Sequence, residues 1–208
     1  MRLGLALLLA VAAAGLLVAG AGANGDPASD VLPFSNVFLS IQDPRTSPAG
    51  HDLLAQTKAA ANQNRPIKVA VISQPSDLGL IQSLWKKPQP YAEFLGKELV
   101  QFGRYNGTLI VSMPNGYGIN GPDAAKGKPV LARLPKPSTS DLEKLGEQTA
   151  VAVQKVAAAN GYVVPAPTGG GSSSSAWIVI LAALGGAAVV GGAVYLALRR
   201  WLMQPEVE

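Results

Sequence analysis

Two aspartates follow apolar runs of the sequence, and carboxylates in such places can serve metal-assisted hydrolysis. Asp77 comes shortly after the run at residues 67–73, and Asp123 comes after the run at 108–113 and a glycine-rich stretch. Sheets of the α/β class place ligands beyond the ends of their strands, where an ion held by carboxylates can activate water. In its local sequence, Gln-Pro-Ser-Asp, Asp77 also fits a turn that caps the next segment, and the sequence favours this structural role.

A metal site needs more ligands than any one motif of this sequence offers. Calcium or magnesium takes about six or more oxygen ligands, usually including several carboxylates. Asp77 and Asp123 are therefore weak metal candidates, and we expect no catalytic residue and no cofactor, with Ca²⁺ or Mg²⁺ only under the hydrolase alternative given below. His51 is the single histidine. Because no motif gives it a nucleophile, it is interpreted as an exposed helix side chain.

The stretch 115–137 is the second place where side chains that could bind a ligand gather. It has four glycines and four prolines and no periodicity, which predicts a long loop. Long loops in compact domains are often functional. The order of its glycines lacks the GxGxxG and Walker patterns of nucleotide sites, so a glycine turn is the simpler interpretation and a binding loop is the alternative. The binding-loop candidates are Asn115, Tyr117, Asn120 and Asp123.

Charge and cysteine content exclude several classes of function. Residues 24–175 have ten lysines and four arginines against eleven acidic residues. This positive charge is mild, scattered and not interleaved with aromatic residues, so we expect no nucleic-acid partner. The chain has no cysteine, which excludes thiol catalysis and cysteine-based zinc sites. In an exported domain this composition is more typical of a bacterial envelope protein than of a disulfide-stabilised secreted one.

Apolar runs and helix signals alternate along residues 24–164 and predict an α/β domain with a small layered sheet and packed helices. The expected strands are 37–41, 67–73 and 108–113, and the expected helices are 47–63, 88–103 and 140–160. Ser47 followed by Pro48 marks a helix start, and Ser140 with Glu143 is expected to form a capping box. Residues 24–30 are small and polar and are expected to be disordered.

Three stretches of this domain, the last of them in two parts, resemble the TPM domain family. Residues 67–73 are similar to the family's first core strand, and Tyr-Ala-Glu-Phe-Leu at 91–95 is similar to its "YA…L" helix. The sequences at 103–111 and 116–121 are similar to its "NG" strand and its "GYG" loop. The resemblance spans residues 31–162 and implies an extracytoplasmic α/β module that is tethered to a membrane.

The departures from the family concern its metal site. Family members described as phosphatases or calcium binders have acidic residues near the Asn-Gly turn and the glycine loop. At these places the chain has Arg104 and Tyr105 before Asn106, and only Asp123 in the following loop. The resemblance therefore implies a degenerate metal site in this chain.

The two ends of the sequence are apolar and predict membrane insertion. Residues 1–23 have the pattern of a signal peptide with a small-residue cleavage site, and their apolar length leaves an uncleaved anchor as the alternative. Residues 176–198 carry no charge and are long enough to cross a bilayer as a helix. Trp177 and Trp201 are placed as interface anchors, and Arg199 with Arg200 predicts a cytoplasmic C-terminus.

A Gly/Ser linker at 165–175 joins the domain to the predicted transmembrane helix, and a short tail at 199–208 follows that helix. Alanine and glycine recur every four residues within 176–198, which is the spacing that permits helix self-association. Together these features predict a single-pass protein of the cell membrane with its N-terminal domain outside.

The sequence thus predicts a non-catalytic interaction or assembly module of the bacterial cell envelope. Its expected partners are the lipid bilayer, through 176–198, and an envelope or membrane protein, through the contact surface at 115–137. The alternative is a calcium- or magnesium-dependent, phosphatase-like hydrolase of the TPM type, with Asp77 and Asp123 as its available carboxylates.

Overall fold

The computed structural model describes residues 25–40 and 42–168. The predicted signal peptide at 1–23, the transmembrane helix at 176–198 with its interface anchors, and the tail at 199–208 lie outside these residues. Within the described part of the chain, no helix combines the length and the apolar character that a membrane span requires.

The domain is an α/β fold built on a four-stranded mixed sheet, as the sequence predicted for its class. The strands are β1 (Val37–Leu39), β2 (Ile67–Val71), β3 (Thr108–Met113) and β4 (Gly116–Asn120), in the spatial order β1-β2-β3-β4. The first three are parallel, and β4 runs antiparallel to β3. The α-helices are α2 (Pro27–Val31), α3 (Pro48–Asn62), α4 (Pro88–Gly103), α5 (Ala124–Arg133) and α6 (Leu142–Ala159). The 3₁₀ helices are η1 (Pro44–Thr46), η2 (Pro75–Leu78) and η3 (Gln82–Leu84).

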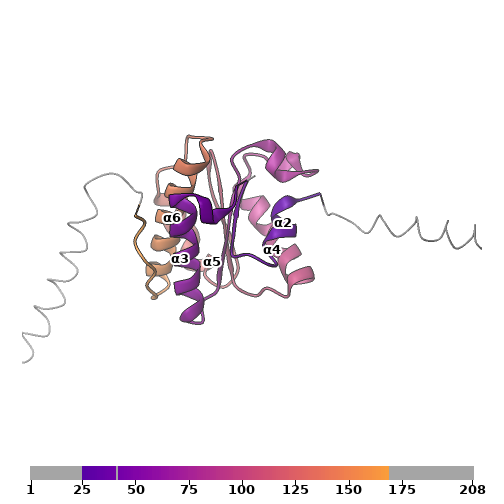
Figure 1. The fold of residues 1–208 in the computed structure, drawn as a ribbon. Coiled ribbons are helices and arrows are strands. Elements are labelled where there is room, and N and C mark those ends of the chain that lie inside the picture. The colour runs from indigo at the N-terminus through magenta and orange to yellow at the C-terminus, as the bar shows by residue number, and fades with distance from the viewer. Residues whose placement is uncertain (1–24, 41, 169–208) are drawn as a thin grey trace, which may run out of the picture. The chain divides into compact units, whose positions relative to one another are not determined.

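Helices cover both faces of the sheet (Figure 1). α3, α5 and α6 lie on one face, where Val69, Val71 and Ile110 contribute to the core. α2 and α4 lie on the other face, where Ala70 and Val111 contribute to a second core. Because side chains alternate between the two faces of a strand, a strand buried on both faces has a continuous apolar sequence. This confirms β3 as the interior strand predicted at 108–113.

The stretch 115–137 is not a long loop, and that prediction was wrong. It contains β4 and α5. In β4, Tyr117 and Ile119 belong to the face covered by α5 and α6, whereas Gly118 lies against α4, where a Cβ would overlap the carbonyl oxygen of Pro88. Glycine is therefore selected by the close approach of a helix, and the resulting Gly-Tyr-Gly pattern only resembles a turn. α5 even accommodates Pro129 within its span.

Two helix starts test the capping predictions. Ser47 caps α3 as predicted, since its hydroxyl accepts a hydrogen bond from Gly50 N at 3.0 Å. The capping box at Ser140 was wrong: the cap of α6 is Asp141, whose carboxylate accepts from Lys144 N at 3.0 Å. Glu143 instead reaches another helix and accepts from Ala49 N at 2.7 Å. Its charge thereby lies at the positive N-terminal end of α3, where the helix dipole favours it.

The polar residues 24–30 were predicted to be disordered, but those described, from Gly25 onward, are structured. α2 occupies most of them, and its cap, Asp26, has no exposed surface. Asp26 Oδ1 accepts hydrogen bonds from Ala28 N at 3.2 Å and from the Tyr91 hydroxyl at 2.8 Å. Burial, with smaller contributions from Glu98 and Asp30, raises the pKa of Asp26 from its ordinary value of 3.8 to about 6. A carboxyl group therefore lies in the core beside α4.

The last described segment, 163–168, lies along α3. The Gln63 amide donates to Val163 O at 2.6 Å, and the Gln56 amide donates to Pro165 O at 3.0 Å. Thr168 donates from its backbone N, at 2.7 Å, and from its hydroxyl, at 2.8 Å, to the Asp52 carboxylate. The contacts of the domain thus continue to Thr168, four residues beyond the predicted end of the domain at 164.

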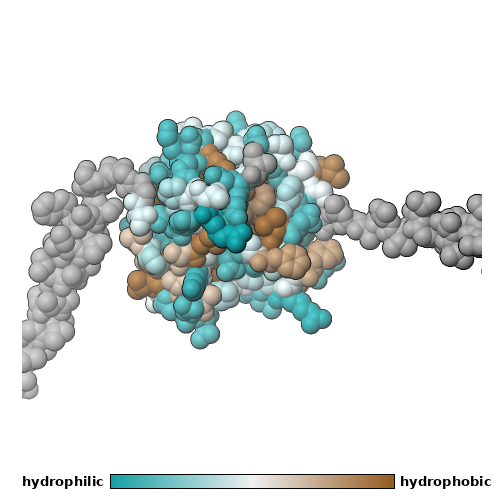
Figure 2. All heavy atoms as spheres, in the orientation of Figure 1, coloured by the Kyte–Doolittle hydropathy of each residue, from teal (hydrophilic) through white to brown (hydrophobic). Residues whose placement is uncertain are grey.

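The surface seen in Figure 2 is largely hydrophilic, and its hydrophobic residues form separate spots. Among the described residues, the large apolar side chains that are most exposed are Phe34, Leu80 and Val163. Scattered apolar residues of this kind are normal on soluble domains. The face seen in Figure 2 therefore has no large continuous apolar patch that could serve as a recognition surface.

Candidate functional site

The two metal candidates, Asp77 and Asp123, lie at opposite ends of the strands. Asp77 follows β2 and accepts a hydrogen bond from Ser73 N, two residues after Val71 at the carboxyl end of that strand. Asp123 donates from its backbone to the Thr108 hydroxyl, and Thr108 pairs with Ile67 at the amino end of β2. The length of the sheet separates the two carboxylates, so they cannot share one ion. In residues 25–40 and 42–168, no group of three or more His, Cys, Asp or Glu is placed to hold a metal.

Asp77 is buried and organises the turn after β2. One carboxylate oxygen accepts from Ser73 N at 2.8 Å and from Gln74 N at 2.9 Å, and the other accepts from the Ser40 hydroxyl. These contacts tie the end of β2 to the end of β1. The turn and capping role that the sequence favoured for Asp77 is confirmed.

Replacing Asp77 with alanine is expected to lower the free energy of unfolding by about 3 kcal/mol, because the buried N–H of Ser73 and the partly buried N–H of Gln74 lose their acceptor. Asp77→Asn is the matched control, since its amide oxygen can still accept from both N–H groups. Urea unfolding of the full-length chain in detergent, followed by circular dichroism, measures the difference. Equal stability of the alanine variant and the native chain would contradict the structural role.

Asp123 is also buried and holds the end of α6 against the start of α5. Its carboxylate accepts from the Tyr162 hydroxyl at 2.7 Å and lies 3.8 Å from the Arg65 guanidinium. Burial is the main cause that raises the pKa of Tyr162 above its ordinary range, and the hydrogen bond to Asp123 adds to it. Asp123 therefore acts as a structural link, although it was proposed as both a metal candidate and a binding-loop residue.

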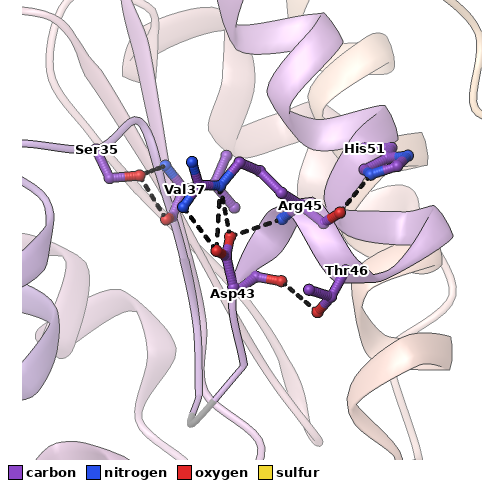
Figure 3. A network of polar contacts seen from close by, with 6 residues as sticks. All are labelled: Ser35, Val37, Asp43, Arg45, Thr46 and His51. Carbon is purple, nitrogen blue, oxygen red and sulfur yellow. Dashed lines mark hydrogen bonds and ion pairs between the residues drawn. The ribbon is translucent and has the colours of Figure 1, made fainter.

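His51 lies on the surface of α3, as predicted. Its Nε2 atom is 2.6 Å from Arg45 O, and Figure 3 shows this contact beside the ion pair between Arg45 and Asp43. The Asp43 carboxylate also accepts from Arg45 N at 2.9 Å and so caps η1. The ring of His51 is engaged with the backbone of η1, the short helix that precedes α3, which is a structural contact.

Lys68 is a buried amine that the sequence did not single out. Its ammonium group donates to Leu32 O and, at 2.8 Å, to Ser35 O, and it lies 5.1 Å from the centre of the Tyr105 ring. Burial lowers its pKa. Carbonyl oxygens and an aromatic face thus hold this cation, and it joins the α2–β1 connection to β2.

A cavity of about 380 Å³ lies at the free edge of β4, between the start of α4 and α5. We call it the β4–α5 cavity. Its lining residues are Pro88, Gln89, Asn115, Gly116, Tyr117, Ile119, Lys128, Leu131, Ala132 and Lys136. Two of the four binding-loop candidates, Asn115 and Tyr117, therefore do lie together in a hollow. Asn120 lines a different hollow of about 170 Å³, and Asp123 is buried.

The groups that face the β4–α5 cavity are of the kind used for recognition. Lys128 and Lys136 bring two positive charges, and the amide of Asn115 donates to Lys86 O at 2.6 Å. Leu131 and Pro88 contribute apolar walls. None of the lining residues is acidic; Glu93, which lies 3.7 Å from Lys128, is outside the lining. The cavity is therefore electropositive and can hold an acidic group by charge and hydrogen bonds.

A larger hollow of about 580 Å³ lies at the carboxyl edge of β1 and β2. Apolar side chains of β1 and α2 line much of it, including Val31, Val37 and Phe38. Two of its polar groups, Ser40 and Asp77, are hydrogen-bonded to each other. These two groups are therefore engaged in a structural contact, and the hollow has no lysine or arginine in its lining.

No family model, no curated protein and no solved structure matches this chain.

Three residues of the β4–α5 cavity were missed as site residues. Gln89 lies in the α4 sequence, and only the contact between α4 and β4 brings it to the cavity. Lys128 and Lys136 were counted only in the mild, scattered positive charge of residues 24–175, and α5, which carries Lys128, was not recognised as a helix. A helical interpretation of 124–133 would have placed Lys128 and Leu131 on neighbouring positions of one face.

Proposed function

We propose that the chain is a single-pass, membrane-anchored interaction module of the bacterial cell envelope, and that its domain outside the membrane binds a protein partner. The observation that carries this proposal is the β4–α5 cavity, whose lining combines two lysines, amide side chains and apolar walls. These are the groups that bind and orient a partner. The anchor is proposed from the uncharged run at 176–198, with Trp177 and Trp201 at its ends and Arg199 and Arg200 behind it.

Membership of the TPM family remains part of this proposal. The three-layered arrangement with a mixed sheet supports it at the level of fold class. The hydrolase alternative would require Asp77 and Asp123 to act on one metal-bound substrate. These residues lie at opposite ends of the strands, and both make structural contacts. The geometry therefore favours the interaction module over the hydrolase.

Site-specific photocrosslinking in intact membranes tests the proposed function. A photoreactive residue in place of Lys136, at the cavity, is expected to give one discrete crosslinked product with another envelope protein. The matched control is the same residue in place of Lys58, an exposed position on α3, which is expected to give none. Equal crosslinking from both positions, or none from Lys136, would contradict a partner at this cavity.

A further inference from the structure

We propose that the β4–α5 cavity binds an extended, acidic peptide segment, which pairs with the backbone of Tyr117 as an added strand. This inference rests on the proposed function and specifies the partner of the same site. Peptides that add to the edge of a sheet obtain affinity from main-chain hydrogen bonds and specificity from side-chain pockets.

The backbone groups of β4 alternate in direction along the strand. Among the strands of residues 25–40 and 42–168, β4 is an edge strand whose one partner is β3. The side chain of Gln89 hydrogen-bonds both backbone groups of Ile119, accepting from its N at 3.1 Å and donating to its O at 3.1 Å. Ile119 therefore points its backbone groups away from β3. Because outward and inward residues alternate along an antiparallel strand, Tyr117 points its N–H and C=O outward as well.

The outward groups of Ile119 and Tyr117 meet different surroundings. At Ile119 a glutamine amide from α4 already makes the two hydrogen bonds that a neighbouring strand would make. Tyr117, one outward position earlier in the strand, is a lining residue of the β4–α5 cavity. A peptide strand beside Tyr117 would therefore make the same kind of backbone hydrogen bonds that the Gln89 side chain makes at Ile119.

The charge of the cavity favours an acidic peptide. Lys128 and Lys136 both line the cavity, and the side chain of Lys128 is 53% exposed, so it can reach a ligand. Leu131 and Pro88 provide apolar contact for a neighbouring side chain of the peptide. An extended segment with glutamate or aspartate at alternate positions would satisfy the lysines and the backbone together.

At the other edge strand, β1, a side chain hydrogen-bonds backbone groups that face away from the sheet. Figure 3 shows the hydroxyl of Ser35 against both backbone groups of Val37 in β1, donating to Val37 O at 2.9 Å and accepting from Val37 N at 3.2 Å. Farther along β1, Gln42 N donates to Leu39 O at 3.4 Å. Edge strands with free backbone groups promote unwanted pairing, so they are commonly blocked. The domain blocks the edge at Val37 and at Ile119 but leaves a cavity at Tyr117.

The test uses the full-length chain in lipid nanodiscs and a six-residue peptide of alternating threonine and glutamate, acetylated and amidated. In the free protein, the amide of Ile119 is expected to exchange slowly with solvent and the amide of Tyr117 quickly. The peptide is expected to slow exchange at Tyr117. The double variant Lys128→Glu with Lys136→Glu is expected to weaken binding by about tenfold, which corresponds to about 1.4 kcal/mol. Lys58→Glu, the matched control, is expected to bind as the native chain does.

Two further peptides separate strand pairing from attraction by charge alone. A peptide with lysine in place of glutamate is expected not to bind, and an acidic peptide that is N-methylated along its backbone is expected to lose binding. Unchanged exchange at Tyr117 with the acidic peptide, or equal binding of the N-methylated peptide, would overturn the added strand. If crosslinking from Lys136 nevertheless succeeded, the proposed function would stand and only this mode of binding would be wrong.

Discussion

Replacing Asp26 with asparagine is expected to stabilise the domain at pH 7 by about 3 kcal/mol, because a buried carboxylate is replaced by a neutral group of the same shape. Asp26 has no exposed surface, and its Oδ2 atom has no hydrogen-bond partner. Burial raises its pKa from 3.8 to about 6 in the folded domain. The carboxyl group of Asp26 therefore holds its proton more tightly in the folded domain than in the unfolded chain.

The sign of the pH dependence follows from this raised pKa. Below about pH 4, Asp26 is protonated in both the folded and the unfolded state, so its burial costs no charge and does not lower the free energy of unfolding. As the pH rises from about 4 through about 6, the unfolded chain loses its proton first and the folded state then has to hold a buried charge. The free energy of unfolding consequently falls over this window and stays low above it.

Urea unfolding of the full-length chain in detergent, repeated between pH 3.5 and pH 7.5, measures this effect. The difference between Asp26→Asn and the native chain should be near zero at the acid end and should grow to its full size by pH 7. Asp30→Asn is the matched control: Asp30 lies one helical turn away and is exposed, so its effect should be small. A loss of stability in Asp26→Asn at pH 7 would contradict this prediction.

Gly118→Ala is expected to destabilise the domain by about 3 kcal/mol, because the added methyl group overpacks the contact between β4 and α4. Its Cβ would overlap the carbonyl oxygen of Pro88, and this obstacle is backbone that cannot rotate away. The start of α4 must therefore move, and Gln89 moves with it. The hydrogen bonds from Gln89 to Ile119 are expected to weaken together with the loss of stability.

Gly103→Ala, at the end of α4, controls for the general effect of adding a methyl group. There the new Cβ would lie 3.8 Å from the nearest atom of Pro33, an ordinary van der Waals distance. This variant is expected to be neutral or slightly stabilising, since alanine favours a helix over glycine. Thermal unfolding and amide exchange at Ile119 report both effects. Normal protection of Ile119 in Gly118→Ala would contradict the proposed close packing.

The parts of the fold that the sequence predicted well have strong local signals. The β-branched run of β2 and the apolar run of β3 fix interior strands, and the Ser47-Pro48 pair fixes the start of α3. β4 and α5 were missed because their glycines and prolines have tertiary causes. Gly118 is small because α4 crosses it, and no local pattern reports a helix that is distant in the sequence.

The candidate site was predicted only in part for the same reason. Asn115 and Tyr117 were identified by their position after a predicted strand, and they do line the cavity. Gln89 lies about thirty residues earlier in the chain and enters only through the contact of α4 with β4. Asp26 was missed because a short polar segment has no apolar periodicity, although its side chain is held by Tyr91 in the core.

The segment 163–168 gives the domain a defined mechanical response. Its hydrogen bonds attach to Asp52, Gln56 and Gln63, which succeed one another along α3. Val164, which lies between these attachments, is also buried in the core. Tension on the chain beyond Thr168 would therefore load the Asp52 contact first, and the attachments at Gln56 and Gln63 and the packing of Val164 lie between that contact and α6.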